Sequence, residues 1–198
     1  MPHAQPLTTR LTRLRGRLAT RRPLTDEGDD PLIWAAVAVI LTPEPDSVLL
    51  IRRAERVGDP WSGHMALPGG RRDPADPDLV TTAIRETLEE VGLALRPDHL
   101  AGSLDDVVPR TPVLPPIAVR PYVFVLDRRP GLVLNPEVAA ADWVPLDLLQ
   151  HPETYHTVQL EIRGESREFP AYRVQEAVVW GMTERILSGL LAQLPTLP

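Results

Sequence analysis

Three glutamates in one short segment could do chemistry together. Glu86, Glu89 and Glu90 are three and four residues apart in a stretch with helical patterning. On a helix, this spacing places their Cβ atoms about 5–6 Å apart on one face. Ionised carboxylates that close repel one another, and carboxylate oxygens suit Mg²⁺ or Mn²⁺. The spacing predicts a divalent-metal site, although a merely solvated acidic helix face has the same pattern.

The segment Gly69–Leu93 contains the elements that must position these glutamates. A double glycine opens it, and a helix should follow, with Asp76 as its cap and Pro77 at its first position. Gly92 can adopt the left-handed conformation that ends a helix. The apolar residues expected to face the core at helical spacing are Val80, Ile84, Leu88 and Val91.

Composition bounds the class of protein. The chain has 198 residues, 43% of them hydrophobic, and a net charge of −6, so it has enough apolar residues for a full core and lacks the positive charge of a nucleic-acid binder. It has no cysteine and no lysine, which excludes disulfides, thiolate chemistry and Schiff-base catalysis. The apolar run Ile33–Leu41 is too short to cross a bilayer, and no secretory signal is evident, so we expect a cytoplasmic protein without a membrane partner.

The first thirty residues differ from the rest. Residues 1–30 are rich in arginine and have no acidic residue before Asp26, and leucines recur at helical spacing at Leu7, Leu11, Leu14 and Leu18. The pattern predicts an amphipathic helix that packs on a single domain of residues 31–198. An anion-attracting patch, a contact in a homodimer, and an organellar targeting segment are the alternatives, in that order.

The remaining pattern alternates strands and helices. Apolar runs bounded by turn residues predict strands, and longer periodic runs predict helices. We therefore expect an α/β fold in which a mixed sheet lies between helices. The expected strands are Ile33–Leu41, Val48–Arg53, His64–Leu67, Leu93–Leu95, Leu100–Val108, Ile117–Leu126, Ala141–Leu146, and a hairpin of Val158–Arg163 and Arg167–Ala171, with helices at Leu146–Leu149 and Gln175–Leu194.

The order of residues around the glutamates resembles the Nudix box. Gly-Gly, a loop, Arg85-Glu86, Glu89-Glu90 and Gly92-Leu93 follow one another as in that motif, with Thr87 at a position that is usually aliphatic. Asp76 stands at the acid position of the box, with one additional residue before the arginine. The resemblance implies an α/β/α sandwich and an enzyme that hydrolyses diphosphates with Mg²⁺ or Mn²⁺. It also implies that the three glutamates and the carbonyl of Gly69 bind the metal.

Other stretches resemble the coenzyme A pyrophosphatase branch of that family. They are Leu49–Arg53, Gly63–Gly70, Asn135–Val138, Trp143–Leu146 and Val179–Thr183. The branch favours phenylalanine where Leu67 stands and glutamine where His64 stands. This resemblance implies coenzyme A or its thioesters as the small-molecule substrate. The alternatives are another nucleoside diphosphate-linked substrate, such as ADP-ribose or a nucleoside triphosphate, and a Nudix-fold binding protein without turnover.

Individual roles follow from this assignment. Arg85, counted with the three glutamates among the catalytic residues, is expected to tie the helix to an acid in the preceding loop, and Glu89 to take the proton from water. The candidates for substrate contact are Arg52, Arg53, His64, Arg110 and Glu137. For each of these a structural or solvated role is the alternative; Arg110, for example, is the one charge in a proline-rich loop of residues 109–116.

Overall fold

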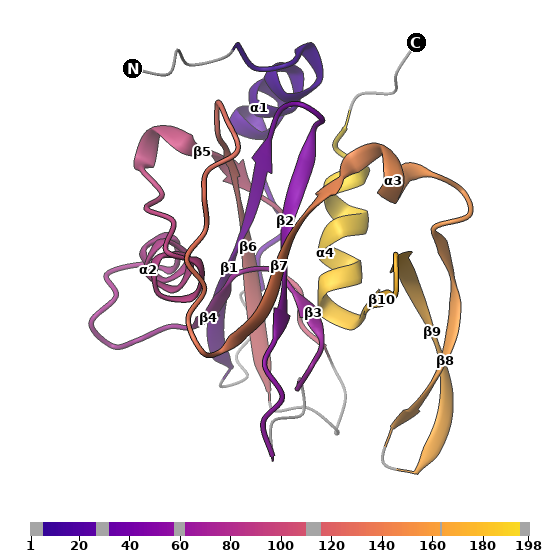
Figure 1. The fold of residues 1–198 in the computed structure, drawn as a ribbon. Coiled ribbons are helices and arrows are strands. Elements are labelled where there is room, and N and C mark those ends of the chain that lie inside the picture. The colour runs from indigo at the N-terminus through magenta and orange to yellow at the C-terminus, as the bar shows by residue number, and fades with distance from the viewer. Residues whose placement is uncertain (1–5, 27–31, 58–61, 110–115, 163, 195–198) are drawn as a thin grey trace.

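The computed structural model describes residues 6–26, 32–57, 62–109, 116–162 and 164–194. In these residues, strands form one seven-stranded sheet and one three-stranded sheet, and helices flank the larger sheet (Figure 1). The elements in chain order are α1 (Thr9–Thr20), β1 (Ile33–Thr42), β2 (Ser47–Arg53), β3 (Met65–Ala66), β4 (Gly69–Arg71), α2 (Leu79–Val91), a 3₁₀ turn (Pro97–His99), β5 (Leu100–Ser103), β6 (Ile117–Val125), β7 (Val138–Pro145), α3 (Leu146–Gln150), β8 (Tyr155–Ile162), β9 (Glu165–Val174), β10 (Ala177–Trp180) and α4 (Gly181–Leu191).

Strand β1 is the centre of the larger sheet. It runs parallel to β6 and antiparallel to β2 and β4, so the sheet is mixed. The chain β3-β2-β1-β6-β5 forms the main order, and β7 pairs with β2. A strand covered on both faces must be apolar throughout, which explains the nearly unbroken hydrophobic sequence of β1.

The two faces of this sheet bury separate hydrophobic clusters. Ala36, Ala38 and Ile40 of β1 pack with residues of α2 on one face. Val39 and Leu41 pack with residues of α1 and α4 on the other. Figure 1 shows α2 and α4 on opposite sides of the sheet. The predicted α/β/α sandwich with a mixed sheet is therefore confirmed.

The N-terminal helix belongs to the second of these clusters. Leu11, Leu14 and Leu18 of α1 are buried against the sheet, and Thr8 caps the helix by accepting a hydrogen bond from the Leu11 N–H. The structure thus places an amphipathic helix on the body, as the leucine spacing predicts. The proposed division of the chain at residues 30 and 31 stays a prediction, as does a role of the helix in a homodimer.

Three predicted elements have the wrong type or length. The predicted helix Gln175–Leu194 begins at Gly181, because residues 177–180 form strand β10 beside β9. β-Branched and aromatic side chains at 178–180 favour a strand over the helical period that the leucines further on suggest. Leu93–Leu95 is not a strand although Leu93 and Leu95 are buried, and the strand predicted over Leu100–Val108 ends at Ser103.

Within the described ranges, no helix is both long and apolar enough to cross a membrane.

Candidate functional site

Helix α2 starts two residues later than the sequence suggests. Asp78, rather than Asp76, is the cap, and its carboxylate accepts a hydrogen bond from the Thr81 N–H at 2.8 Å. Gly92 ends the helix with φ +66°, as predicted. The predicted cap was wrong because the Asp76 side chain turns back toward the helix and has another partner.

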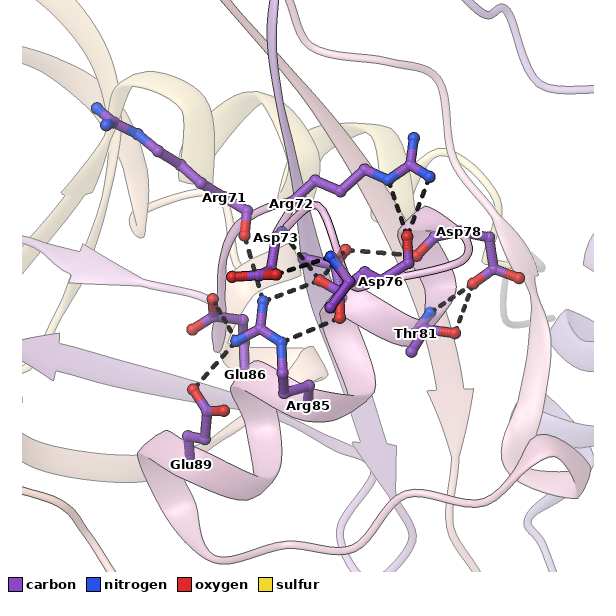
Figure 2. Close-up of polar contacts among 11 residues, drawn as sticks. Arg71, Arg72, Asp73, Asp76, Asp78, Thr81, Arg85, Glu86 and Glu89 are labelled. Atoms are coloured by element: carbon purple, nitrogen blue, oxygen red, sulfur yellow. Dashed lines mark hydrogen bonds and ion pairs between the residues drawn. The ribbon is translucent and has the colours of Figure 1, made fainter.

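That partner is Arg85 (Figure 2). Its Nε and Nη2 donate to the two carboxylate oxygens of Asp76 at 3.1 and 2.9 Å, and Thr82 Oγ1 adds a hydrogen bond at 2.9 Å. Asp76 is only 5% exposed, and a buried carboxylate stays ionised only when it is paired with an opposite charge and hydrogen-bonded. Hydrogen bonds from Arg85 lower the pKa of Asp76 to about 2, and the same pair raises the pKa of Arg85. The prediction that Arg85 ties the helix to an acid of the preceding loop is confirmed, even with the additional residue in that loop.

The pair predicts a specific acid sensitivity. Because the pKa of Asp76 falls from 3.8 to about 2 on folding, its contribution to stability is complete above pH 4 and is lost as the pH falls toward 2. The shift corresponds to about 2 kcal/mol. In urea unfolding, the free energy of unfolding of Asp76→Asn should be lower than that of the wild type by this amount at pH 7, and the difference should shrink between pH 4 and 2.5. Asp98→Asn, which breaks an exposed pair with Arg96, is the control and should change stability far less.

The three glutamates occupy different environments. Glu90 is 4% exposed and accepts a hydrogen bond from the Gly69 N–H at 2.9 Å. The Glu86 side chain is 18% exposed, and that of Glu89 is 52% exposed. Burial is the largest cause that raises the pKa of Glu90 to about 7, and burial also raises the pKa of Glu86. The predicted single acidic face is thus wrong in detail: Glu90 points into the protein, whereas the predicted core residue Leu88 is 51% exposed.

Arg85 also lies between the two more accessible glutamates. Its Nη1 donates to Glu86 at 3.0 Å and to Glu89 at 3.1 Å (Figure 2). In the part of the chain that the structure describes, no three acidic or imidazole groups are placed to hold an ion together. The chemistry of the donor set nevertheless fits a divalent cation, because Glu86 and Glu90 are carboxylates that burial penalises when charged. Glu89 would join them by leaving Arg85.

Two glycines form the bend that faces these carboxylates. Gly69 has φ +150°, and a Cβ there would lie 2.3 Å from the Ala36 carbonyl oxygen. A Cβ on Gly70 would lie 2.5 Å from the carboxyl carbon of Glu86. The absence of side chains at this bend therefore lets β4 pass close to β1 on one side and leaves room for the Glu86 carboxylate on the other.

Gly70→Ala is expected to impair the site more than the fold. The new methyl group would collide with the end of a flexible side chain, so the Glu86 carboxylate would be displaced while the backbone stays in place. We expect Mn²⁺ affinity to fall by about tenfold or more, the size seen when the support of a metal ligand is removed. Calorimetric titration with Mn²⁺ measures this, and Gly131→Ala, where no atom lies within 4 Å of the new Cβ, is the matched control. Equal Mn²⁺ affinity in the two variants would show that the lack of a side chain at Gly70 does not matter for metal binding.

The structure brings two of the other predicted residues to this site. Burial raises the pKa of Glu90 most, the charge of Arg53 opposes this rise, and the charge of Glu137 adds to the rises of both Glu86 and Glu90, so both side chains lie within electrostatic reach of the carboxylates. Glu137 also pairs at 2.8 Å with Arg56, which the sequence analysis missed because a lone arginine in a polar loop carries no periodic signal.

The remaining candidates for substrate contact lie on the other face of the sheet, pack against another side chain, or fall outside the described residues. Arg52 is exposed and is the register partner of Met65, whose side chain packs in the cluster beneath α1 and α4, so Arg52 lies on the sheet face away from α2. The His64 ring packs edge-on against Trp180 at 5.0 Å, and its carbonyl accepts a hydrogen bond from the Arg53 N–H at 3.0 Å. Arg110 lies outside the described residues.

Comparisons with known proteins agree with this geometry. Residues 32–162 match the model of the NUDIX domain family. An uncharacterized Schizosaccharomyces pombe protein is 41% identical over 131 residues, which cover 63% of this chain and 40% of that protein. The Photorhabdus laumondii protein named uncharacterized Nudix hydrolase NudL is 33% identical over 162 residues, or 80% of this chain and 83% of that one.

Solved structures share the fold. A MutT/nudix family protein from Enterococcus faecalis aligns with a TM-score of 0.57 at 18% identity, covering 82% of this chain and 62% of that chain. The NUDIX domain of Shewanella oneidensis NrtR, solved as a complex with ADP ribose, aligns with a TM-score of 0.50 at 24% identity, covering 69% and 86%. At identities of 18% and 24%, these structural similarities show the fold of the chain and nothing about its substrate.

Proposed function

The chain belongs to the NUDIX family, and from this membership we propose that it is a Mg²⁺- or Mn²⁺-dependent pyrophosphatase that hydrolyses the diphosphate of coenzyme A or its thioesters. The observation that carries the proposal is the placement of Glu86 and Glu90. Both carboxylates face the Gly69–Gly70 bend and are partly or fully withdrawn from solvent, which penalises their charged forms, and a bound cation would offset that penalty.

The metal-binding residues in this proposal are Glu86, Glu89 and Glu90 together with the Gly69 carbonyl. A divalent cation held there would offset the negative charge of a diphosphate and make a bound water more acidic. Arg85 keeps the helix in register with the loop through Asp76, and it can release Glu89 without losing that anchor because different guanidinium nitrogens make the two contacts.

Glu89 is the residue we propose to accept the proton from water. It is half exposed and lies on the helix turn that contains Glu86 and Glu90, so water can reach it next to the buried carboxylates. Glu137 is the alternative acceptor, since its charge already acts on Glu86 and Glu90. We propose that Arg53, whose charge also reaches Glu90, attracts a phosphate oxygen.

Coenzyme A is favoured as the substrate by the stretches outside the box. The segment Gly63–Gly70 leads directly into the glycine bend, and Val179–Thr183 contains Trp180, which packs on His64 of that segment. Two stretches that resemble the coenzyme A branch therefore meet beside the site. Addition of water across the phosphoanhydride bond of coenzyme A would give an adenosine bisphosphate and phosphopantetheine.

A substrate screen tests the proposal. Purified protein with Mg²⁺ or Mn²⁺ should be assayed against coenzyme A, acetyl-coenzyme A, ADP-ribose, dinucleoside polyphosphates and nucleoside triphosphates. The proposal expects the highest kcat/KM for coenzyme A or its thioester and no turnover after chelation of the metal. The best activity on ADP-ribose would replace the substrate but keep the chemistry, and the absence of turnover on every compound would favour a binding protein.

A further inference from the structure

Three aromatic rings follow one another beside the edge of the larger sheet. The Trp180 ring lies 5.0 Å from the His64 ring at an interplanar angle of 63°, and 5.1 Å from the Phe169 ring at 53°. His64 precedes edge strand β3, Phe169 belongs to β9, and Trp180 ends β10. We call His64, Trp180 and Phe169 the aromatic row.

One end of the aromatic row is hydrogen-bonded to Arg53, whose charge reaches the candidate metal site. The Arg53 N–H donates to the His64 carbonyl at 3.0 Å, and the charge of Arg53 acts on Glu90. At the start of α4, Thr183 Oγ1 donates to the Met65 carbonyl at 3.1 Å, which ties the helix after Trp180 to strand β3. The His64 end of the row is therefore hydrogen-bonded to β2 at Arg53, and Trp180, its middle member, is tied to β3 through α4.

The other end lies on the hairpin of β8 and β9, which projects from the main sheet (Figure 1). The base of this hairpin is fixed to α4 by a polar network centred on a buried glutamate. Glu184, 3% exposed, accepts hydrogen bonds from Tyr155 at 3.1 Å and Ser188 at 2.8 Å, and Tyr172 contacts Ser188 at 2.7 Å. A network of this kind holds the hairpin in one position, so Phe169 is presented at a defined place.

The row has the properties of a surface for a planar group. All three residues are partly exposed. The rings meet at 53° and 63°, so the edge of one ring lies toward the face of the next, and the partial exposure of all three side chains leaves the rest of their ring surface open to a ligand. Flat nucleobases stack on such faces without a need for a particular hydrogen-bond pattern.

We propose that the aromatic row binds the adenine base of the nucleotide half of the substrate, and so makes the β8–β9 hairpin a specificity element. The inference rests on the proposed function, since it takes the substrate to be a nucleoside diphosphate derivative whose phosphates lie at Glu86 and Glu90. It adds a place for the base, at the opposite end of the row from the carboxylates. Aromatic–base stacking predicts that loss of one ring weakens binding by about tenfold.

Binding of ADP and of inorganic pyrophosphate, each with Mg²⁺ and followed by calorimetry, separates the base from the phosphates. Phe169→Ala should weaken ADP binding by about tenfold and leave pyrophosphate binding unchanged. Phe169→Leu, which keeps apolar bulk but has no ring face, should behave in the same way and guards against a folding defect. Gln159→Ala, an exposed position in the partner strand of the same hairpin, is the matched control and should bind both probes as the wild type does.

The outcomes also separate this inference from the proposed function. Wild-type affinity for ADP in both Phe169 variants, equal weakening of ADP and pyrophosphate, or no ADP binding by the wild type would each overturn the inference. Weakened binding of 4′-phosphopantetheine with unchanged ADP binding would overturn it too, because the row would then hold the other half of coenzyme A. A chain that turns over none of the screened diphosphates, yet loses ADP affinity selectively in the Phe169 variants, would contradict the enzyme proposal and support the row.

Discussion

Replacing Glu89 with glutamine is expected to lower turnover by about 10³-fold while the fold stays intact. A positioned general base accelerates proton transfer by about 10²–10⁴-fold, and glutamine cannot accept the proton. The side chain is 52% exposed and its contact with Arg85 is a surface pair one helical turn apart, so the variant should lose at most about 0.5 kcal/mol of stability. Steady-state kinetics on the best substrate of the screen, together with thermal unfolding, measures both effects.

The matched control for Glu89 is Glu161→Gln, which removes an equal charge from an exposed position in β8. Its turnover should equal that of the wild type. Near-wild-type turnover in Glu89→Gln would show that Glu89 is not the general base. Glu137, whose charge acts on Glu86 and Glu90, would then be the next candidate. A large fall in both variants would instead indicate that overall charge controls the rate.

The second large effect is expected for Gly69→Ala, which should destabilise the protein by about 3 kcal/mol or more. The backbone has φ +150° at this residue, a conformation that costs other residues about 1–3 kcal/mol. The added Cβ would also lie 2.3 Å from the Ala36 carbonyl oxygen and 2.6 Å from the Val37 Cα, and neither backbone atom can move without disturbing β1. Urea unfolding provides the measurement.

Gly164→Ala measures the cost of positive φ alone, without the steric clash that a Cβ would cause at Gly69. Gly164 also has positive φ, at +80°, but no atom lies within 4 Å of the new Cβ. It should therefore lose only about 1 kcal/mol. If Gly69→Ala were no less stable than Gly164→Ala, the close passage of β4 beside β1 would not be the reason for the glycine.

The residues that the candidate site contains were more predictable from sequence than its geometry. Residue types and spacing suffice to place Glu86, Glu89 and Glu90 on one helix and Gly69 at its approach, because both features are local. A helical projection groups residues by side of the helix, but it does not show which side packs against the sheet. It therefore assigns Glu90 to the outer face and Leu88 to the core, whereas packing against β1 and β4 buries Glu90 and exposes Leu88.

The other features that the sequence does not predict depend on contacts between residues that are distant in the chain. Asp76 has the sequence features of a helix cap, but Arg85 offers it a bidentate ion pair across nine residues, and that interaction outweighs the cap. Trp180 belongs to a stretch whose apolar residues match a helical period, yet pairing with Ala171 makes it the end of a strand. The aromatic row could not be predicted, since its three members are far apart in sequence and only the fold brings them together.

A Mn²⁺ titration tests most directly whether the carboxylates at the glycine bend bind a metal. The electron paramagnetic resonance signal of free Mn²⁺, followed as protein is added, measures affinity without any assumption about substrate. The wild type is predicted to bind Mn²⁺, and Glu86→Gln and Glu90→Gln are each predicted to bind it at least about tenfold more weakly. Absence of Mn²⁺ binding by the wild type, or unchanged affinity in both variants, would contradict the account.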